Sequence, residues 1–232
     1  MTMRQSFAMK SIWLGIPAIT LAFSALAADE PTPLTLPLGA PMSAYMASSG
    51  TQSVYGAGTV NNQAGSGTGV TVRDPAVPVT FEGQPALRKD TVITLNFQTS
   101  SGSSTIASTL INYYDNDYTA PRGAVISGLY SVTDASQPLP ATAKAGDSGT
   151  WYTMKIYNDS TKSLQLGTAT VNYSVQADTD STLLLSLVTT AKPVLGTPIV
   201  NTSIYRLGAA GAAVPVKEVA TSAGTDVQIT YE

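Results

Sequence analysis

The chain of 232 residues contains no cysteine and no histidine. Without cysteine the fold cannot be held by disulfides, so it must depend on the burial of apolar side chains. Without histidine the chain lacks Ser-His-Asp and Cys-His nucleophile systems, imidazole acid–base catalysis and the usual zinc, copper and non-haem iron ligand sets. Carboxylates, lysine, tyrosine and oxygen-ligated metals remain as means of catalysis. We nevertheless expect a protein that is not an enzyme, with no catalytic, cofactor-binding or metal-binding residues.

Charged residues are also scarce, at 12% of the chain, about half the usual share. Acids outnumber bases by 15 to 12, which gives no electrostatic footprint for a phosphate backbone. Nucleic acid is therefore not an expected partner. Hydroxyl, amide and glycine residues supply the polarity instead, while Val, Leu, Ile and Tyr stay plentiful. This composition suits a β-rich protein with hydroxyl-covered outer faces, not a disordered chain.

The first 28 residues follow the order of a secretory signal peptide. Arg4 and Lys10 precede an uncharged stretch over 11–28, which ends in the small-residue triplet Ala25-Leu26-Ala27. A positive segment, an apolar segment and small residues in that order are typical of such a signal. We expect residues 1–27 to be removed, leaving Ala28 as the mature N-terminus and an exported protein, periplasmic or at the cell surface.

The alternative for this segment is an anchoring transmembrane helix. Gly15, Pro17 and Ser24 interrupt the apolar run, whereas a spanning helix needs about 20 mostly apolar residues. Cleavage would leave 10 basic residues against 15 acids, a net charge of −5. Anionic membrane surfaces are poor partners for such a chain, and we do not expect an integral membrane protein.

Residues 28–70 have the composition of a flexible arm. Four prolines interrupt its first half, and prolines cannot donate to a sheet ladder. The second half, Ser48–Gly69, is rich in glycine and serine, which is typical of linkers and exposed loops. We expect an arm over 28–70 followed by a β domain over 71–232, with Val70–Val72 as a candidate edge strand.

The rest of the chain shows short alternating runs separated by turn residues, a pattern typical of strands and hairpins. The clearest run is Thr168–Ala177, in which Val171, Tyr173 and Val175 alternate with Asn172 and its polar neighbours. The expected strands are Thr91–Gln98, Thr109–Tyr114, Ala124–Val132, Trp151–Tyr157, Thr168–Ala177, Leu183–Val188, Ile199–Leu207 and Asp226–Tyr231. The predicted fold is all-β, an antiparallel meander closing as a β-sandwich or an open up-and-down barrel.

Three local patterns carry candidate chemistry. Gly146-Asp147-Ser148-Gly149 copies the tetrad around a protease serine, but with no histidine we interpret it as a turn. Two acid pairs, Asp115/Asp117 and Asp178/Asp180, offer closely spaced oxygens for calcium, although both lie where strands must reverse. Paired carboxylates could also hydrolyse glycosides.

A further candidate is a set of aromatic side chains that could stack on a sugar or a peptide. The alternative is that they form cross-strand pairs within the sheet. The set comprises Tyr113, Tyr114, Tyr118, Tyr130, Trp151 and Tyr157.

Two resemblances accompany these patterns. The final alternating run, Asp226-Val227-Gln228-Ile229-Thr230-Tyr231, with Leu34, Leu36 and Leu38 near the N-terminus, resembles the ends of chaperone–usher fimbrial subunits. Pro33, Pro37 and the missing disulfide depart from that pattern. Over about 110–216, the GDSG turn, the Tyr-x-Asp-Ser hairpin (YNDS) and the late Tyr-Arg strand (IYRL) resemble uncharacterised exported bacterial β-rich proteins. This second resemblance implies export and a β fold, and it implies no activity.

The function that we expect is that of an exported, non-catalytic envelope or cell-surface β-domain with a structural or binding role. Its expected partners are envelope components, glycans or other proteins. One alternative is a fimbrial or adhesive subunit. Another is a carbohydrate-binding or carboxylate-dependent glycan-active module.

Overall fold

The computed structural model describes residues 33–60, 62–222 and 225–232. The expected signal peptide over 1–27 lies outside these residues. The described part consists almost entirely of antiparallel strands, which confirms the predicted all-β class. In this part of the chain no helix is both long enough and apolar enough to cross a membrane.

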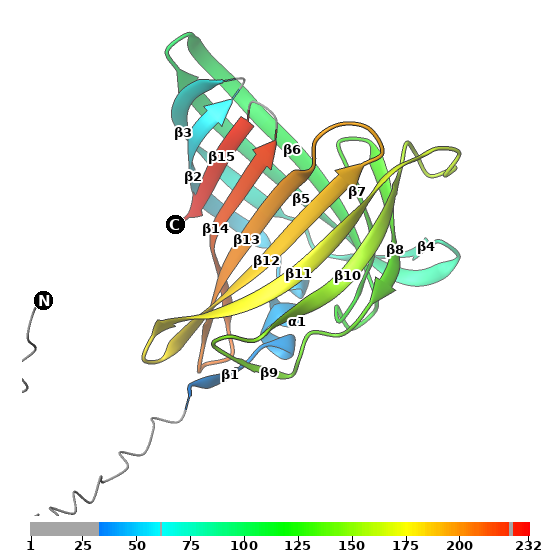
Figure 1. Ribbon diagram of the computed structural model, residues 1–232, viewed down its shortest axis with the longest axis vertical. Coiled ribbons are helices and arrows are strands. Elements are labelled where there is room, and N and C mark those ends of the chain that lie inside the picture. The colour runs from blue at the N-terminus through cyan, green and yellow to red at the C-terminus, as the bar shows by residue number, and fades with distance from the viewer. Residues whose placement is uncertain (1–32, 61, 223–224) are drawn as a thin grey trace, which may run out of the picture. The chain divides into compact units, whose positions relative to one another are not determined.

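Twelve strands form a closed barrel (Figure 1). Closure occurs where β3 pairs with β5, from Gly65 opposite Thr99 to Arg73 opposite Thr91. The expected antiparallel barrel is therefore confirmed in part, because the barrel is closed and not open, and the other alternative, a sandwich, does not describe the fold. The barrel strands are β2 (Gly50–Val60), β3 (Gln63–Arg73), β5 (Gln84–Thr99), β6 (Gly102–Tyr114), β7 (Pro121–Ile126), β8 (Leu129–Ser136), β10 (Ser148–Tyr157), β11 (Gln165–Thr179), β12 (Thr182–Pro193), β13 (Ile199–Gly208), β14 (Ala213–Ser222) and β15 (Thr225–Tyr231).

Three further strands lie outside the barrel wall. β1 (Thr35–Pro37) pairs with β9 (Thr142–Lys144) in a small separate sheet. β4 (Val77–Phe81) pairs only with the first part of β5. The Phe81 ring stacks on Tyr113 with centroids 4.1 Å apart. Because the neighbours of Tyr113 on β6 point into the barrel, this stack lies on the outer face.

The arm expected over 28–70 is wrong for residues 33–70. These residues form β1, the helix α1 (Gly39–Ala47), β2 and most of β3. Val70–Val72 belongs to β3, which is paired on both sides and is not an edge strand. The glycines mislead because Gly56, Gly65, Gly67 and Gly69 occupy inward positions of β2 and β3, where a Cβ would meet Leu95, Phe97 or the backbone beside them. A linker composition therefore encodes the tightest part of the barrel wall.

Apart from the run Ala124–Val132, each predicted strand lies within one barrel strand, and the alternation of β11 is confirmed from Val171 to Val175. Val171 and Val175 are each 2% exposed, whereas Asn172 is exposed. The predicted run Ala124–Val132 is two strands, joined by a turn at Ser127-Gly128 in which both residues have positive φ.

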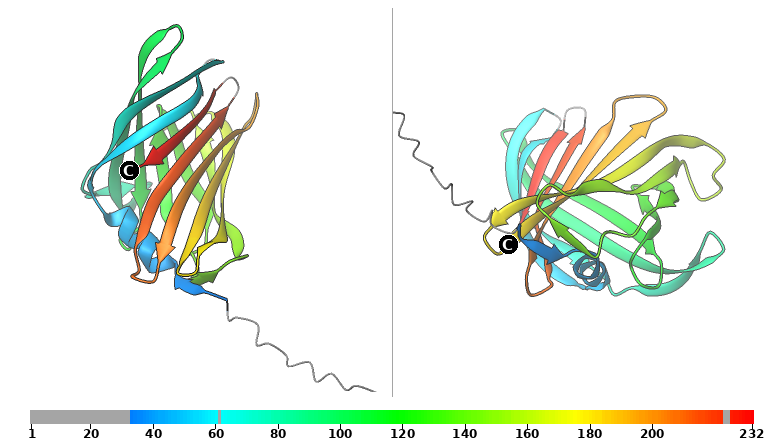
Figure 2. Two further views of the ribbon diagram at one scale, coloured as in Figure 1. Left: turned by 90° about the vertical axis from the view of Figure 1, so that its left-hand side faces the viewer. Right: turned by 60° about the horizontal axis from the view of Figure 1, so that its bottom comes forward.

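The main apolar core lies where α1 meets β11, β12 and β13, at the end of the barrel that also holds β1 and β9 (Figure 2). Leu38 and Met42, at the start of the helix, are almost fully buried. They belong to one cluster with Val175, Leu185 and Leu207. The helix therefore closes one end of the barrel with its own apolar side chains.

Candidate binding cavity in the barrel

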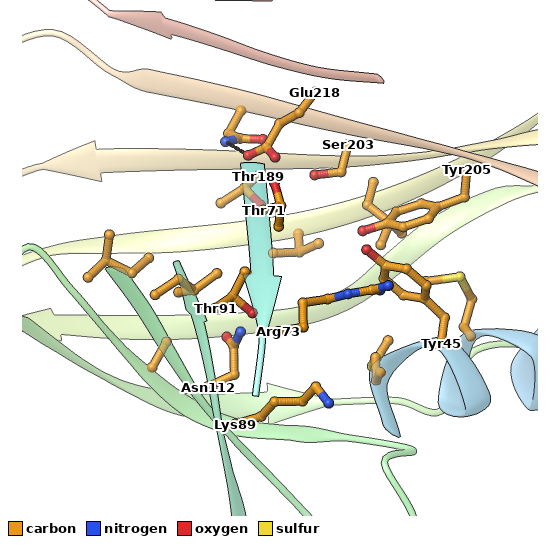
Figure 3. A pocket seen from close by; sticks show the side chains of 18 of the residues that line it. Tyr45, Thr71, Arg73, Lys89, Thr91, Asn112, Thr189, Ser203, Tyr205 and Glu218 are labelled. Atoms are coloured by element: carbon orange, nitrogen blue, oxygen red, sulfur yellow. Dashed lines mark hydrogen bonds between the residues drawn. The ribbon is translucent and has the colours of Figure 1, made fainter. Parts of the chain in front are cut away.

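A cavity of about 280 Å³ lies between α1 and the inner faces of the strands. This volume is near the lower end of the usual range for small-molecule sites, about 300–1,000 Å³. Figure 3 shows side chains from β3, β5 and β6 facing others from β12, β13 and β14 across this space. The strand alternation places them there, because every second residue of a barrel strand points inward.

The cavity opens to solvent beside β6 and β7. Ser108 and Ile126 both line it and are both exposed, Ile126 to 42%. The pairing of β6 with β7 ends at Leu110 opposite Ile126, so residues 102–109 of β6 extend past the end of β7. The wall is lower at this point, and a small molecule could enter there.

The cavity has one polar side and one apolar side. Polar side chains come mainly from β3, β5, β13 and β14, and apolar ones mainly from β5, β6, β7 and β10. The polar residues include Thr71, Arg73, Lys89, Thr91, Asn112, Thr189, Asn201, Ser203 and Glu218, and the apolar ones include Ile93, Leu110, Ala124, Ile126, Met154 and Leu187. Such a lining suits an amphipathic ligand.

Arg73 is the cation of the cavity that has an unpaired hydrogen-bond donor. Its guanidinium carbon lies 4.4 Å from the centre of the Tyr45 ring, a cation–π contact (Figure 3). Its Nη1 is buried, and among the described residues it has no hydrogen-bond partner and no acid within ion-pair distance. Thr71 Oγ1, two residues earlier on the same face of β3, is likewise buried without a partner.

Lys89 also points inward, but its ammonium group is hydrogen-bonded to the C-terminal end of α1. The side chain is 3% exposed, and Nζ donates to the carbonyl of Ala47 at 3.1 Å and to that of Ser48. A cation at the C-terminal end of a helix satisfies carbonyls that have no partner within the helix. Burial lowers the pKa of Lys89. This contact ties α1 to the barrel wall.

Glu218 is the acid of the cavity and is held by two donors. Its carboxylate accepts hydrogen bonds from Asn201 Nδ2 at 2.8 Å and from the Tyr231 hydroxyl at 3.1 Å. Burial, and secondarily the charge of Glu218, raises the pKa of Tyr231. Burial likewise raises the pKa of Tyr45 and of Tyr205, whose rings meet edge to face at 4.9 Å. These hydroxyls therefore stay neutral around pH 7.

A second hollow, of about 390 Å³, lies on the other side of α1, against Tyr118 and Leu139. Met42, Met46 and Trp151 line both spaces. Trp151 Nε1 is buried without a hydrogen-bond partner. The fluorescence of the Trp151 indole should therefore respond to a molecule bound in the cavity.

The two acid pairs and the Gly146–Gly149 tetrad, which the sequence suggested as candidate sites, do not come together in the structure. Asp115 accepts from the amides of Thr119 and Ala120, and Asp178 pairs with Arg206 at 2.7 Å on the outer face. Among the described residues, neither pair belongs to a cluster of three or more acids that could hold a metal ion. Of the Gly146–Gly149 tetrad, Gly146 lies in a turn with Ala145, and Ser148 and Gly149 already belong to β10; the Asp147 carboxylate accepts from the Lys144 amide.

The six candidate aromatics do not share a surface. Tyr113 and Tyr130 lie on the outer face near Phe81, and the Tyr130 hydroxyl donates to Glu82. Tyr114 and Trp151 line the cavity instead. The residues that matter most in the cavity, Thr71, Arg73 and Glu218, were not candidates, because single inward polar residues leave no periodic signal.

Comparisons with known proteins identify no relative. No family model matches the chain, and neither the curated proteins nor the solved structures include a match.

Proposed function

We propose that this protein is an exported, non-catalytic binding protein of the bacterial envelope or cell surface that holds a small amphipathic molecule inside its barrel. The observation that carries the proposal is the two-sided cavity, closed by α1 at one end and open beside Ser108 and Ile126.

The energetics of the interior support a binding role. A barrel of purely structural purpose gains most from an interior filled with apolar side chains. Here the interior keeps a cavity lined by three charged side chains, and the buried donor of Arg73 has no partner. An unsatisfied buried donor costs about 1–3 kcal/mol. A ligand that occupies the space and accepts that hydrogen bond would offset this cost.

Two observations favour binding over the alternatives. Donor-strand polymerisation needs an incomplete sheet, but β15 pairs with β14 on one side and with β2 on the other. Hydrolysis of glycosides by the usual route needs two facing carboxylates. Among the described residues that line the cavity, Glu218 is the single acid.

The test is saturable binding of a neutral apolar fluorophore, N-phenyl-1-naphthylamine. We expect one site per chain, with enhanced fluorescence in wild type. Ser203→Phe fills the cavity from β13 and should abolish the signal. Thr202→Phe places the same ring on the outer face of that strand and should leave it intact. Equal binding by both variants would refute a site in the barrel.

The export part of the proposal rests on the residue order within 1–27 and has its own test. Mass spectrometry of protein made in a bacterial host should give a chain that begins at Ala28. A chain that still carries Met1 would contradict it.

A further inference from the structure

We infer that the ligand of this cavity is a small monocarboxylate, bound with its carboxylate on Arg73 and its apolar part toward Ile126. The inference rests on the proposed function and names the chemical class that the cavity selects.

The geometry at Arg73 points to a carboxylate. The Arg73 guanidinium carbon lies 4.4 Å from the centre of the Tyr45 ring, and a cation–π contact leaves N–H donors of the guanidinium available for a ligand. Nη1 is one of these donors and is buried without a partner. A guanidinium edge matches the two oxygens of a carboxylate in a bidentate pair. Thr71, 4% exposed and also unpartnered, offers a hydroxyl from the same face of β3.

The charge of the cavity sets the charge of the ligand at −1. Arg73, Lys89 and Glu218 are the charged residues of its lining, so the protein contributes a net charge of +1 with Lys89 protonated. Lys89 donates to backbone carbonyls, and Glu218 accepts from Asn201 and Tyr231. A monoanion would neutralise the charge of the cavity. A second negative charge on the ligand would be repelled by Glu218, and a cationic ligand would be repelled by Arg73.

The shape of the cavity sets the rest of the molecule. From Arg73 toward the opening, the apolar side is formed by Ile93, Leu110 and Ile126, with Met154 from β10. A space of about 280 Å³ holds a short aliphatic chain or a single ring rather than a long lipid.

The experiment compares three probes of eight carbons with different head groups: octanoate, 1-octanol and octylammonium. Each displaces N-phenyl-1-naphthylamine from the full chain at pH 7. We expect octanoate to bind about tenfold or more tighter than 1-octanol, because hydrogen bonds to charged groups contribute that much. Arg73→Met should weaken octanoate about ten- to hundredfold and change 1-octanol by no more than about twofold.

Two variants control for indirect effects. Arg206→Met removes the same charge from the outer face of β13, where Arg206 pairs with Asp178, and should leave octanoate binding unchanged. Glu218→Gln removes the cavity's negative charge, so octanoate should bind several-fold tighter and octylammonium more weakly. A gain of affinity cannot result from a damaged fold.

The outcomes separate this inference from the proposed function. If octanoate and 1-octanol bind equally and Arg73→Met changes neither, the carboxylate class is refuted, while loss of the fluorophore in Ser203→Phe would still support the cavity. Tightest binding by octylammonium also refutes it. If wild type binds no fluorophore at all, the proposed function itself fails.

Discussion

Gly67→Ala is the substitution that tests the closure of the barrel most directly. Gly67 lies on β3 opposite Phe97 of β5, in the seam that joins the two ends of the sheet. A Cβ at this position would lie 1.9 Å from the Asn96 carbonyl oxygen and 2.9 Å from the Phe97 Cα. Both are backbone atoms, so neither can rotate away. The two strands would have to separate.

The expected cost follows from the size of this clash. Overpacking by one methyl group in a well-packed interior costs about 1–3 kcal/mol. Relief here requires movement of backbone rather than of a side chain, so we expect at least 2 kcal/mol, on the order of the upper half of that range. In a chain of this size that corresponds to a loss of about 4–8 °C in the melting temperature.

Gly208→Ala is the matched control. Gly208 ends β13, and a Cβ there would have no atom within 4 Å. Alanine reduces the entropy of the unfolded chain, so this variant should match wild type or gain up to about 1 kcal/mol. Urea unfolding followed by circular dichroism measures both free energies, and an unchanged slope shows that the transition is comparable. A loss below about 0.5 kcal/mol in Gly67→Ala would refute the tight β3–β5 seam.

Three more predictions test the interior. Val175→Ala should cost about 1–3 kcal/mol in urea unfolding, and Asn172→Ala on the outer face should stay within about 0.5 kcal/mol; the reverse order would place the register off by one. Lys89→Met should cost about 1–3 kcal/mol, because it leaves the carbonyls at the end of α1 unpaired. Arg88→Met breaks the surface ion pair of Arg88 with Asp90 and should cost no more than about 1 kcal/mol. Equal costs of the two variants in thermal melts would contradict the capping role of Lys89. Stability should fall above about pH 10, where unfolded tyrosines ionise but buried ones do not, by up to about 1.4 kcal/mol per pH unit for each tyrosine; a pH titration of the urea midpoint that stays flat to pH 12 would contradict this. Burial raises the pKa of Tyr45, Tyr114, Tyr152 (to about 12), Tyr205 and Tyr231.

The strands that could be predicted are those whose inner residues are apolar. In β11 the alternation of Val171 and Val175 with Asn172 identifies both the strand and its buried face. In β13 the inner positions are Asn201, Ser203 and Tyr205, which line the cavity, so the run could be recognised as a strand but its polar inner face could not.

The strands β2 and β3 could not be predicted for a different reason. Several of their inner positions hold glycines, which give no apolar period and which suggest a linker by composition. Glycine is required there because the wall passes close to Leu95 and Phe97, and those residues lie some 30 positions later in the chain. Closure joins β3 to β5 past the intervening β4, and local patterns carry no information on such a pairing.

Arg73→Met distinguishes a residue kept for a ligand from one kept for the fold. When an ion pair or a hydrogen-bonded network holds a buried charge, removing one member costs about 3–5 kcal/mol because the partner is left unpaired. Arg73 has no such partner among the described residues, and its contact with the Tyr45 ring contributes about 0.5–2 kcal/mol. Methionine removes the unsatisfied donor Nη1 and adds apolar contacts. The ligand-free variant should therefore unfold in urea within about 1 kcal/mol of wild type, or above it. Octanoate at 100 times its dissociation constant should stabilise wild type by about 2.7 kcal/mol and the variant by much less. A loss of several kcal/mol without ligand would show that Arg73 is a structural residue, and the unpaired donor would then not indicate a ligand.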